Sequence, residues 1–229
     1  MTEIRKNPKL GEANAVSLFG AVIQASQLGL DIGTKAHLVP FYNGKTKSYE
    51  VNMIPDYRGL MQLARNSGDI GAINARIVRD GDKFDYQLGT AEWINHKPKP
   101  DNDAAEITHV YAIARSSDNK WSQFEVLTRA EVDKVKAQAT AGISDAAKKY
   151  APWFTNYEAM AMKTAVKRLC KFLPSSSELQ QAITLDDLSD AGVSQHNASV
   201  IDASFEHVNT ETGEVTSKAD EMNEKAGAA

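Results

Sequence analysis

The stretch EITHVYAIARSSDNKWSQFEVLT (residues 106–128) indicates the fold class. Two runs rich in β-branched and aromatic residues, 106–115 and 120–128, flank the polar SSDN, a pattern typical of a β-hairpin. A hairpin joins two antiparallel strands, so this part of the sheet is expected to be antiparallel. Thr128 and Glu131 then have the spacing of a capping box, which predicts that a helix follows the second strand.

Outward from this hairpin, helical and strand patterns alternate along the chain. The expected elements are a helix over 14–28, a hairpin over 36–54, a helix over 56–68 with Pro55 in its first turn, two strands within 73–88 around the turn Asp80-Gly81-Asp82, and the longest helix, from a capping box of Thr155 and Glu158 to about Leu173. Because hairpins and helices occupy separate stretches of the sequence, we expect an α+β fold, with a mainly antiparallel sheet packed against helices.

Charge is distributed unevenly along the 229 residues. The net charge is −4, but residues 1–185 carry +4 and residues 186–229 carry −8. The acidic end has few apolar residues, so it cannot bury enough surface to offset its ordering entropy. The sequence therefore predicts a mildly basic domain over 1–188 and a mostly disordered acidic tail over 189–229. The short apolar island 198–205 is a candidate docking peptide or a strand that folds back.

The predicted longest helix carries the densest basic face. On a helical wheel, its cations fall on one side together with an aromatic ring and a hydroxyl; these residues are Lys163, Lys167, Arg168, Lys171, Tyr157 and Thr164. Cations neutralise phosphates, and an aromatic ring offers a stacking surface to an unpaired base. An ordinary solvated helix face is the alternative interpretation.

A second basic face is expected on the helix over 56–68, where Arg58, Gln62 and Arg65 share one side. An exposed polar face is the alternative there too. Arg76 and Arg79 lie on the strand that follows and point to opposite faces, so at most one joins the same surface, and Arg76 is the one expected to contact DNA.

The sequence patterns that could indicate catalysis, a metal site or a cofactor site each lack a required residue or spacing, or have a simpler explanation. Gly44-Lys45-Thr46 resembles the end of a phosphate-binding loop, but Val39 stands where that motif needs glycine. Asp80, Asp82 and Asp85 are more simply explained by a turn than by a nuclease metal site. The histidines lack metal-ligand spacing, and the single cysteine, Cys170, excludes an internal disulfide. The sequence thus predicts no cofactor, no metal site and no enzyme activity.

Several motifs in order resemble the RecT family of phage single-strand annealing proteins. They are TEIRKNPKLG (2–11), QASQLGLDIG (24–33), YRGLMQLARNSG (57–68), ARIVRDGDKFDYQLG (75–89), THVYAIAR (108–115) and PWFTNYEAMAMKTAVKRLCKFLP (152–174). The resemblance runs from about residue 2 to about residue 188.

The resemblance implies ATP-independent binding and annealing of complementary single DNA strands during phage-type recombination. It implies a homo-oligomeric ring or filament on DNA, a partner exonuclease, and a bacterial cytoplasmic setting; a single-strand-binding protein is a further candidate partner, through the tail. The family's basic motif matches Lys163, Thr164, Lys167, Arg168 and Lys171 here. Its YRG motif matches Tyr57, Arg58 and Gly59, followed by Arg65.

Two departures from the family pattern qualify this expectation. The chain begins at the TEIRK-like segment, where family members carry a longer N-terminal segment expected to help protomers pack. Met162 and Lys167 stand where members often have Lys and Arg, and lysine lacks the bidentate fork of arginine. A metal-dependent nuclease and a non-annealing nucleic-acid- or protein-binding remnant remain the alternatives.

Overall fold

The computed structural model describes residues 2–141, 143, 145–149, 151–195, 207–208 and 215–216. The chain divides into two units, Met1–His196 and Asn197–Ala229. In the second unit, β8 (His207–Val208) pairs antiparallel with β9 (Val215–Thr216). The expected disorder of the acidic tail and the island 198–205 otherwise fall outside the described residues.

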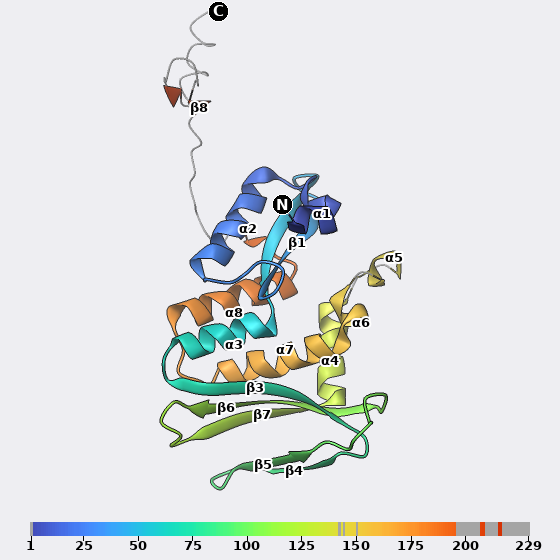
Figure 1. Ribbon diagram of the computed structural model, residues 1–229. Helices are drawn as coiled ribbons and strands as arrows, with labels where there is room; N and C mark the ends of the chain where they lie inside the picture. The colour runs from blue at the N-terminus through green and yellow to red at the C-terminus, as the bar shows by residue number, and fades with distance from the viewer. Residues whose placement is uncertain are drawn as a thin grey trace, which may run out of the picture. The chain divides into compact units, whose positions relative to one another are not determined.

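The first unit is α+β, as the sequence predicts, and its sheets are antiparallel (Figure 1). Its helices are α1 (Thr2–Lys6), η1 (Pro8–Leu10), α2 (Ala15–Gln27), α3 (Tyr57–Asn66), α4 (Arg129–Ala139), α5 (Asp145–Lys148), α6 (Pro152–Thr155), α7 (Tyr157–Cys170) and α8 (Ser177–Asp190). Its strands are β1 (Ala36–Asn43), β2 (Ser48–Pro55), β3 (Ile70–Arg79), β4 (Lys83–Gln87), β5 (Trp93–Lys97), β6 (Ile107–Ser116) and β7 (Ser122–Thr128).

A three-stranded sheet in the order β3-β6-β7 supports the helices. The predicted hairpin over 106–128 is confirmed as β6 and β7. Alternate residues of the central strand, Val110, Ala112 and Ala114, are fully buried. Their small volume lets α7 approach the sheet closely, and α7 and α3 lie along the same face of it (Figure 1).

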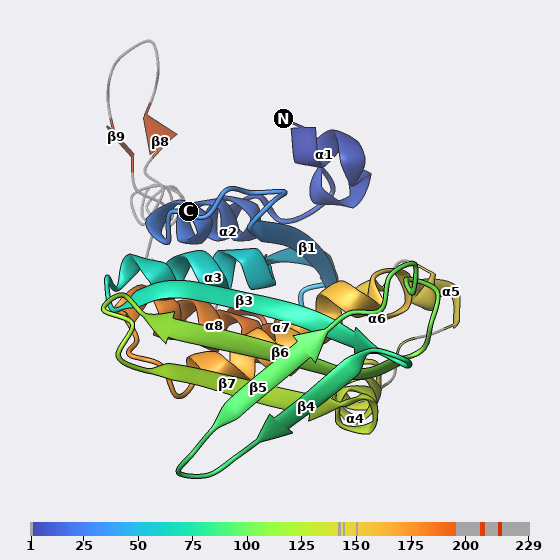
Figure 2. The ribbon, with the colours of Figure 1, turned by 60° about the horizontal axis from the view of Figure 1, so that its bottom comes forward.

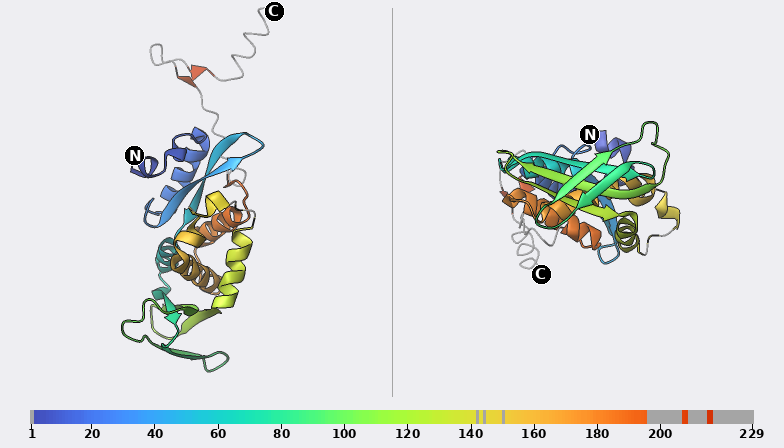
Figure 3. Two further views of the ribbon diagram at one scale, coloured as in Figure 1. Left: turned by 90° about the vertical axis from the view of Figure 1, so that its right-hand side faces the viewer. Right: turned by 90° about the horizontal axis from the view of Figure 1, so that it is seen from below.

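The hairpin β4–β5 crosses the other face of this sheet (Figures 2 and 3). Its Phe84 ring stacks on Tyr111 of β6, with 5.8 Å between ring centroids. The strands expected around Asp80-Gly81-Asp82 exist, but they do not form a hairpin, because β3 pairs with β6 while β4 pairs with β5. The two predicted strands and the turn between them are thus confirmed, and each strand pairs with a partner further along the chain.

Side-chain caps start four of the helices, α2, α3, α4 and α8. The capping box of Thr128 and Glu131 is present at α4, as predicted. Pro55 ends β2 instead of opening α3, and the side chain of Asp56 caps that helix by accepting from Arg58 N. The predicted capping box of Thr155 and Glu158 was wrong: α7 starts after Asn156, and Glu158 forms an ion pair with Arg79 of β3.

In the first unit, a further helix, α8, follows the basic helix α7. The helix α8 has no counterpart among the predicted elements, and the predicted boundary at 188/189 falls inside it. The Gln195 side chain is buried; it accepts from Met53 N at 2.7 Å and donates to the carbonyls of Met53 and Leu185. We therefore propose that the tail begins after Gln195.

Candidate nucleic-acid interface

The helix α7 is held in the centre of the first unit by its apolar side. Ala161, Ala165, Val166 and Leu169 are fully buried and belong to the main hydrophobic core. This burial aims the opposite side of the helix toward α4 and α8. Phe172 lies just beyond the helix and is exposed, because the helix ends at Cys170.

A groove of about 290 Å³ opens on that opposite side of α7. It contains all five positions of the predicted basic motif, namely Lys163, Thr164, Lys167, Arg168 and Lys171. The other lining residues are Val135, Gln138 and Ala139 of α4, Trp153 and Met160, and Asp186, Asp187 and Asp190 of α8. The structure thus brings the predicted α7 residues together, but it faces them with an acidic wall.

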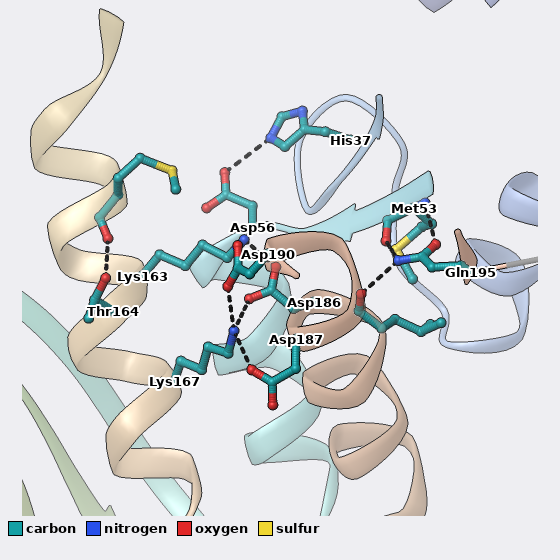
Figure 4. Close-up of polar contacts among 12 residues, drawn as sticks. His37, Met53, Asp56, Lys163, Thr164, Lys167, Asp186, Asp187, Asp190 and Gln195 are labelled. Atoms are coloured by element: carbon teal, nitrogen blue, oxygen red, sulfur yellow. Dashed lines mark hydrogen bonds and ion pairs between the residues drawn. The ribbon is translucent and has the colours of Figure 1, made fainter. Parts of the chain in front are cut away.

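Lys163 lies at the closed end of the groove. Its Nζ is 2.5 Å from Oδ1 of Asp186, and the two side chains are 10% and 1% exposed (Figure 4). The expectation of a solvent-facing lysine was wrong here, because α8 covers this part of α7. Lys163 serves first to neutralise a buried carboxylate.

Lys167 lies one turn further along and contacts three carboxylates. Its Nζ is 2.7 Å from Asp186 and 2.8 Å from each of Asp187 and Asp190 (Figure 4). Burial alone would lower the pKa of Lys167, but the three carboxylates outweigh it and raise the pKa above its ordinary range. Lys167 therefore keeps its charge, and that charge is already compensated.

The outer end of the groove is more accessible. The Arg168 side chain is 43% exposed, and its nearest carboxylate, on Glu131 of α4, is 3.7 Å away. Lys171 follows the last residue of α7 and is exposed. The Thr164 hydroxyl donates to the carbonyl of Met160, a bond within the helix. Arg168 and Lys171 are thus the cations of the groove best placed to meet a ligand from solvent.

Tyr157 is engaged by α4. Its hydroxyl donates to Asp133 Oδ1 at 2.8 Å, and the Arg129 guanidinium lies 4.7 Å from its ring centroid. Lys136 lies 5.3 Å from the same centroid. Burial and the hydrogen bond to Asp133 raise the pKa of Tyr157. The ring is therefore occupied by cations of its own chain, and a base would have to displace them in order to stack there.

The predicted residues of α3 lie on a neighbouring surface. Arg58 is exposed, and its Nε donates to the Tyr57 hydroxyl at 3.2 Å. Arg65 is exposed and donates to the carbonyl of Ile73 at 3.0 Å. Gly59 is buried, and a Cβ there would collide with the carbonyl oxygen of Lys35, so close backbone packing accounts for this glycine.

Arg76 and Arg79 separate as their spacing predicts. Arg76 pairs across the sheet with Tyr111, on the face crossed by the β4–β5 hairpin. Arg79 instead reaches Glu158 of α7 and the carbonyl of Ala105. The structure therefore joins Arg79, and not the predicted Arg76, to the helix that carries the groove.

The acidic wall of α8 is the feature that sequence reasoning missed. Asp186, Asp187 and Asp190 belong to the acidic stretch 186–229, although Asp186 and Asp190 have the same four-residue spacing as Lys163 and Lys167. Residues four apart share one face of a helix, so this matched spacing was a usable signal for two packed helices.

The three aspartates considered for a nuclease metal site lie in different environments. Asp82 is buried and accepts from Arg79 N and Lys99 N, while Asp80 and Asp85 are exposed. Within the part of the chain that the structure describes, no three His, Cys, Asp or Glu side chains are grouped so that they could hold a metal ion. The same described residues contain no helix long and apolar enough to cross a membrane.

Comparison with known proteins agrees with this arrangement of motifs. Residues 1–201 match the RecT family, which is more than half of the chain. The chain belongs to the RecT family. It is 43% identical over 217 residues to Protein RecT of Escherichia coli (strain K12), covering 90% of this chain and 78% of that protein. RecT-family membership connects this chain with DNA recombination, single-stranded DNA binding and strand annealing.

Proposed function

We propose that this chain binds single-stranded DNA along the α7 groove and anneals it to a complementary strand without ATP. The observation that carries the proposal is that all five positions of the family's basic motif line one groove. The family assignment supports annealing in general, and the groove suggests where the strand lies.

The contacts are expected to form in a definite order. Arg168, whose side chain is 43% exposed, and the exposed Lys171 are the most accessible cations, so they meet the phosphates first. Lys167 joins them when a phosphate replaces Asp187 or Asp190 as its partner. Thr164 lines the same groove, and Lys163 stabilises the buried end of the groove through its ion pair with Asp186.

A second set of contacts is proposed on α3, which packs beside α7. Arg58 and Arg65 supply exposed charge there, and the Tyr57 ring lies next to the Arg58 guanidinium, 5.5 Å away. Arg76 lies on the hairpin side of the sheet, so its predicted DNA contact requires a separate path for the strand. Tyr157 is proposed to stack on a base only after Arg129 and Lys136 move aside.

No bond is broken in this mechanism. The cations screen repulsion between the two sugar-phosphate backbones, and contacts to the backbone leave base edges open for pairing. Binding is therefore expected to tolerate any sequence. A nucleotide site is not needed, and Gly44-Lys45-Thr46 forms the turn between β1 and β2, where Asn43 Oδ1 accepts from Lys45 N.

Annealing kinetics of two complementary oligonucleotides, without ATP and with magnesium both present and absent, test the proposal. We expect annealing well above the spontaneous rate, and a log–log salt slope of about −3 for roughly four phosphate contacts. The variant Arg168→Ala/Lys171→Ala should lose most of this activity. Its control, Lys45→Ala/Lys47→Ala, removes the same charge from the turn between β1 and β2 and should keep it.

Three results would contradict the proposal. A salt slope near zero would show that the groove does not bind the phosphates of DNA. Magnesium-dependent cleavage of a labelled strand would favour the nuclease. Monomers that bind DNA without annealing, measured by the mass of the DNA-bound complex, would favour the non-annealing remnant.

The acidic segment after Gln195 is proposed to contact protein partners, for which an exonuclease and a single-strand-binding protein are the candidates. This segment carries a net negative charge, whereas the outer end of the groove is positive. Shielding of the groove from DNA by the segment is therefore the competing role. Deleting residues 196–229 leaves the hydrogen bonds of Gln195 intact. Tighter DNA binding at low salt after this deletion would indicate shielding, whereas unchanged DNA binding with lost partner capture would indicate docking.

A further inference from the structure

The short helix α6 turns one aromatic ring toward the core and the next toward solvent. Trp153 is buried and lines the α7 groove, whereas Phe154, the residue after it, is 41% exposed. Successive residues of a helix point about 100° apart, so burial of Trp153 directs Phe154 outward. The helix α6 lies beside α4, at the start of α7 (Figure 1). Phe154 therefore lies next to the groove, where α7 begins.

Two lysines lie over the ring of Phe154. Nζ of Lys136, on α4, is 4.7 Å from the ring centroid, and Nζ of Lys148, on α5, is 6.0 Å from it. Within the described chain, no cation lies over the rings of the other exposed phenylalanines, which are Phe19, Phe41 and Phe172. An exposed ring and positive charge thus come together at Phe154.

The charge of Lys136 is available to a ligand. Among the described residues, Lys148 forms an ion pair with Asp145, whereas Lys136 forms none. Lys136 instead lies between two rings, since its Nζ is also 5.3 Å from the ring centroid of Tyr157. A cation–π contact at an exposed site is weak, so Lys136 can turn toward a phosphate at little cost.

Phe154 is freer to accept a base than Tyr157 is. The Tyr157 hydroxyl donates to Asp133 Oδ1, and Arg129 and Lys136 both lie over its ring. Phe154 has no polar group that ties it to a neighbour, and the lysines over it have long, flexible chains. Stacking of a base on an aromatic ring is stronger than an exposed cation–π contact. A base can therefore replace the lysines over Phe154, and the lysines then lie within reach of the phosphate of that nucleotide.

We propose that Phe154 stacks on a base of single-stranded DNA, and that Lys136 and Lys148 contact the phosphate of the stacked nucleotide. This inference rests on the proposed function, because it requires a strand that follows the α7 groove. The cations of the groove bind phosphates, whereas Phe154 adds a contact that requires a base. Every base has an aromatic face, so the contact is expected to tolerate any sequence.

Fluorescence anisotropy with two short oligonucleotides of equal length, one of thymidines and one of abasic sugar-phosphate, tests the stacking contact. We expect the wild type to bind the thymidine strand more tightly. Phe154→Leu should reduce this preference about fivefold or more and leave the affinity for the abasic strand unchanged. Phe154→Tyr keeps a ring and should keep the preference. Phe41→Leu is the matched control, since Phe41 is 37% exposed on β1, and it should bind both strands like the wild type.

Lys136→Met separates the charge from the ring. It should weaken binding of both strands by the same factor and make the log–log salt slope less steep by about 0.7, the value for one lost phosphate contact on a single strand. An unchanged salt slope would overturn the phosphate contact of Lys136. Thermal unfolding of each variant shows that it is folded.

The base preference and the salt slope distinguish the two proposals. A reduced preference in Phe154→Leu, with the abasic affinity retained, supports the stacking contact. Equal binding of the two strands by the wild type, or an unchanged preference in Phe154→Leu, would overturn the stacking contact, while a steep salt slope would still support the groove. Normal binding by Arg168→Ala/Lys171→Ala would contradict only the proposed path along α7. A wild type that binds neither strand would contradict both proposals.

Discussion

Lys163 and Asp186 form a nearly solvent-free ion pair, with Nζ and Oδ1 2.5 Å apart. The pair joins α7 to α8 across the closed end of the groove. A buried charge that loses its partner is costly, since the remaining ion stays desolvated. The basic motif therefore has a structural end at Lys163 and an accessible end at Arg168.

Lys163→Met is accordingly expected to reduce the free energy of unfolding by about 3 kcal/mol, because Asp186 keeps only Lys167 as a counterion. The double variant Lys163→Met/Asp186→Leu should recover much of this loss, because no buried charge remains unpaired. Urea unfolding measures both. A Lys163→Met protein as stable as the wild type would show that the pair adds nothing to the fold.

Asp187 and Asp190 are expected to weaken DNA binding, because both hold Lys167 and both present negative charge at the groove. Asp187→Asn/Asp190→Asn should tighten binding of an oligonucleotide by about three- to tenfold at low salt. Fluorescence anisotropy measures this. The control is Asp101→Asn/Asp103→Asn, which changes two exposed acids in the loop after β5 and should leave the DNA affinity nearly unchanged. Equal DNA affinities of the two double variants would argue against competition at Lys167.

Asp82 is expected to make stability depend on pH in the acidic range. Burial alone would raise the pKa of this carboxyl, but the N–H groups of Lys99 and Arg79 outweigh it, with further help from His96 and Asn102, and hold the pKa well below its ordinary value. The stabilisation is then fully present above about pH 4 and is lost as the pH falls toward the lowered pKa.

Asp82→Asn should therefore lower the melting temperature at pH 7 by about 5 °C. The difference from the wild type should shrink as the pH falls below 4. Thermal melts across this range provide the measurement. A difference that stays constant with pH would mean that the charge of Asp82 is not what stabilises the loop.

Gly59→Ala should destabilise the protein by about 2 kcal/mol or more, because the added methyl group meets the carbonyl oxygen of Lys35. Gly20→Ala is the contrasting change, since open space surrounds that position. It should raise stability by up to about 1 kcal/mol through helix propensity. Equal effects of the two substitutions on urea unfolding would contradict the packing role of Gly59.

Local patterns predicted those parts of the fold that local chemistry controls. The alternation in 106–128 predicted β6 and β7, and the Thr128–Glu131 spacing predicted the start of α4. The pairing of β3 with β6 could not be read in the same way. Strand partners are chosen by burial across the whole sheet, and the turn at Asp80-Gly81-Asp82 looks the same whether or not its flanking strands pair.

Helix ends were predicted less well where several caps compete. Thr155 and Glu158 have the spacing of a capping box, but Glu158 binds Arg79 instead. An ion pair with a residue on β3 cannot be foreseen from the residues around Thr155. A tertiary contact of this kind replaces a local cap when it binds the side chain that would otherwise cap the helix.

The candidate site shows the same division. The amino-acid sequence alone determined that Lys163, Lys167 and Arg168 share one side of a helix with Lys171 near its end, and it determined the family through the order of its motifs. Only the tertiary structure decided which of these charges face solvent. Lys163 and Asp186 are 23 residues apart in the chain, and charges interact through space over a few ångströms, so their compensation exists only once α8 packs against α7.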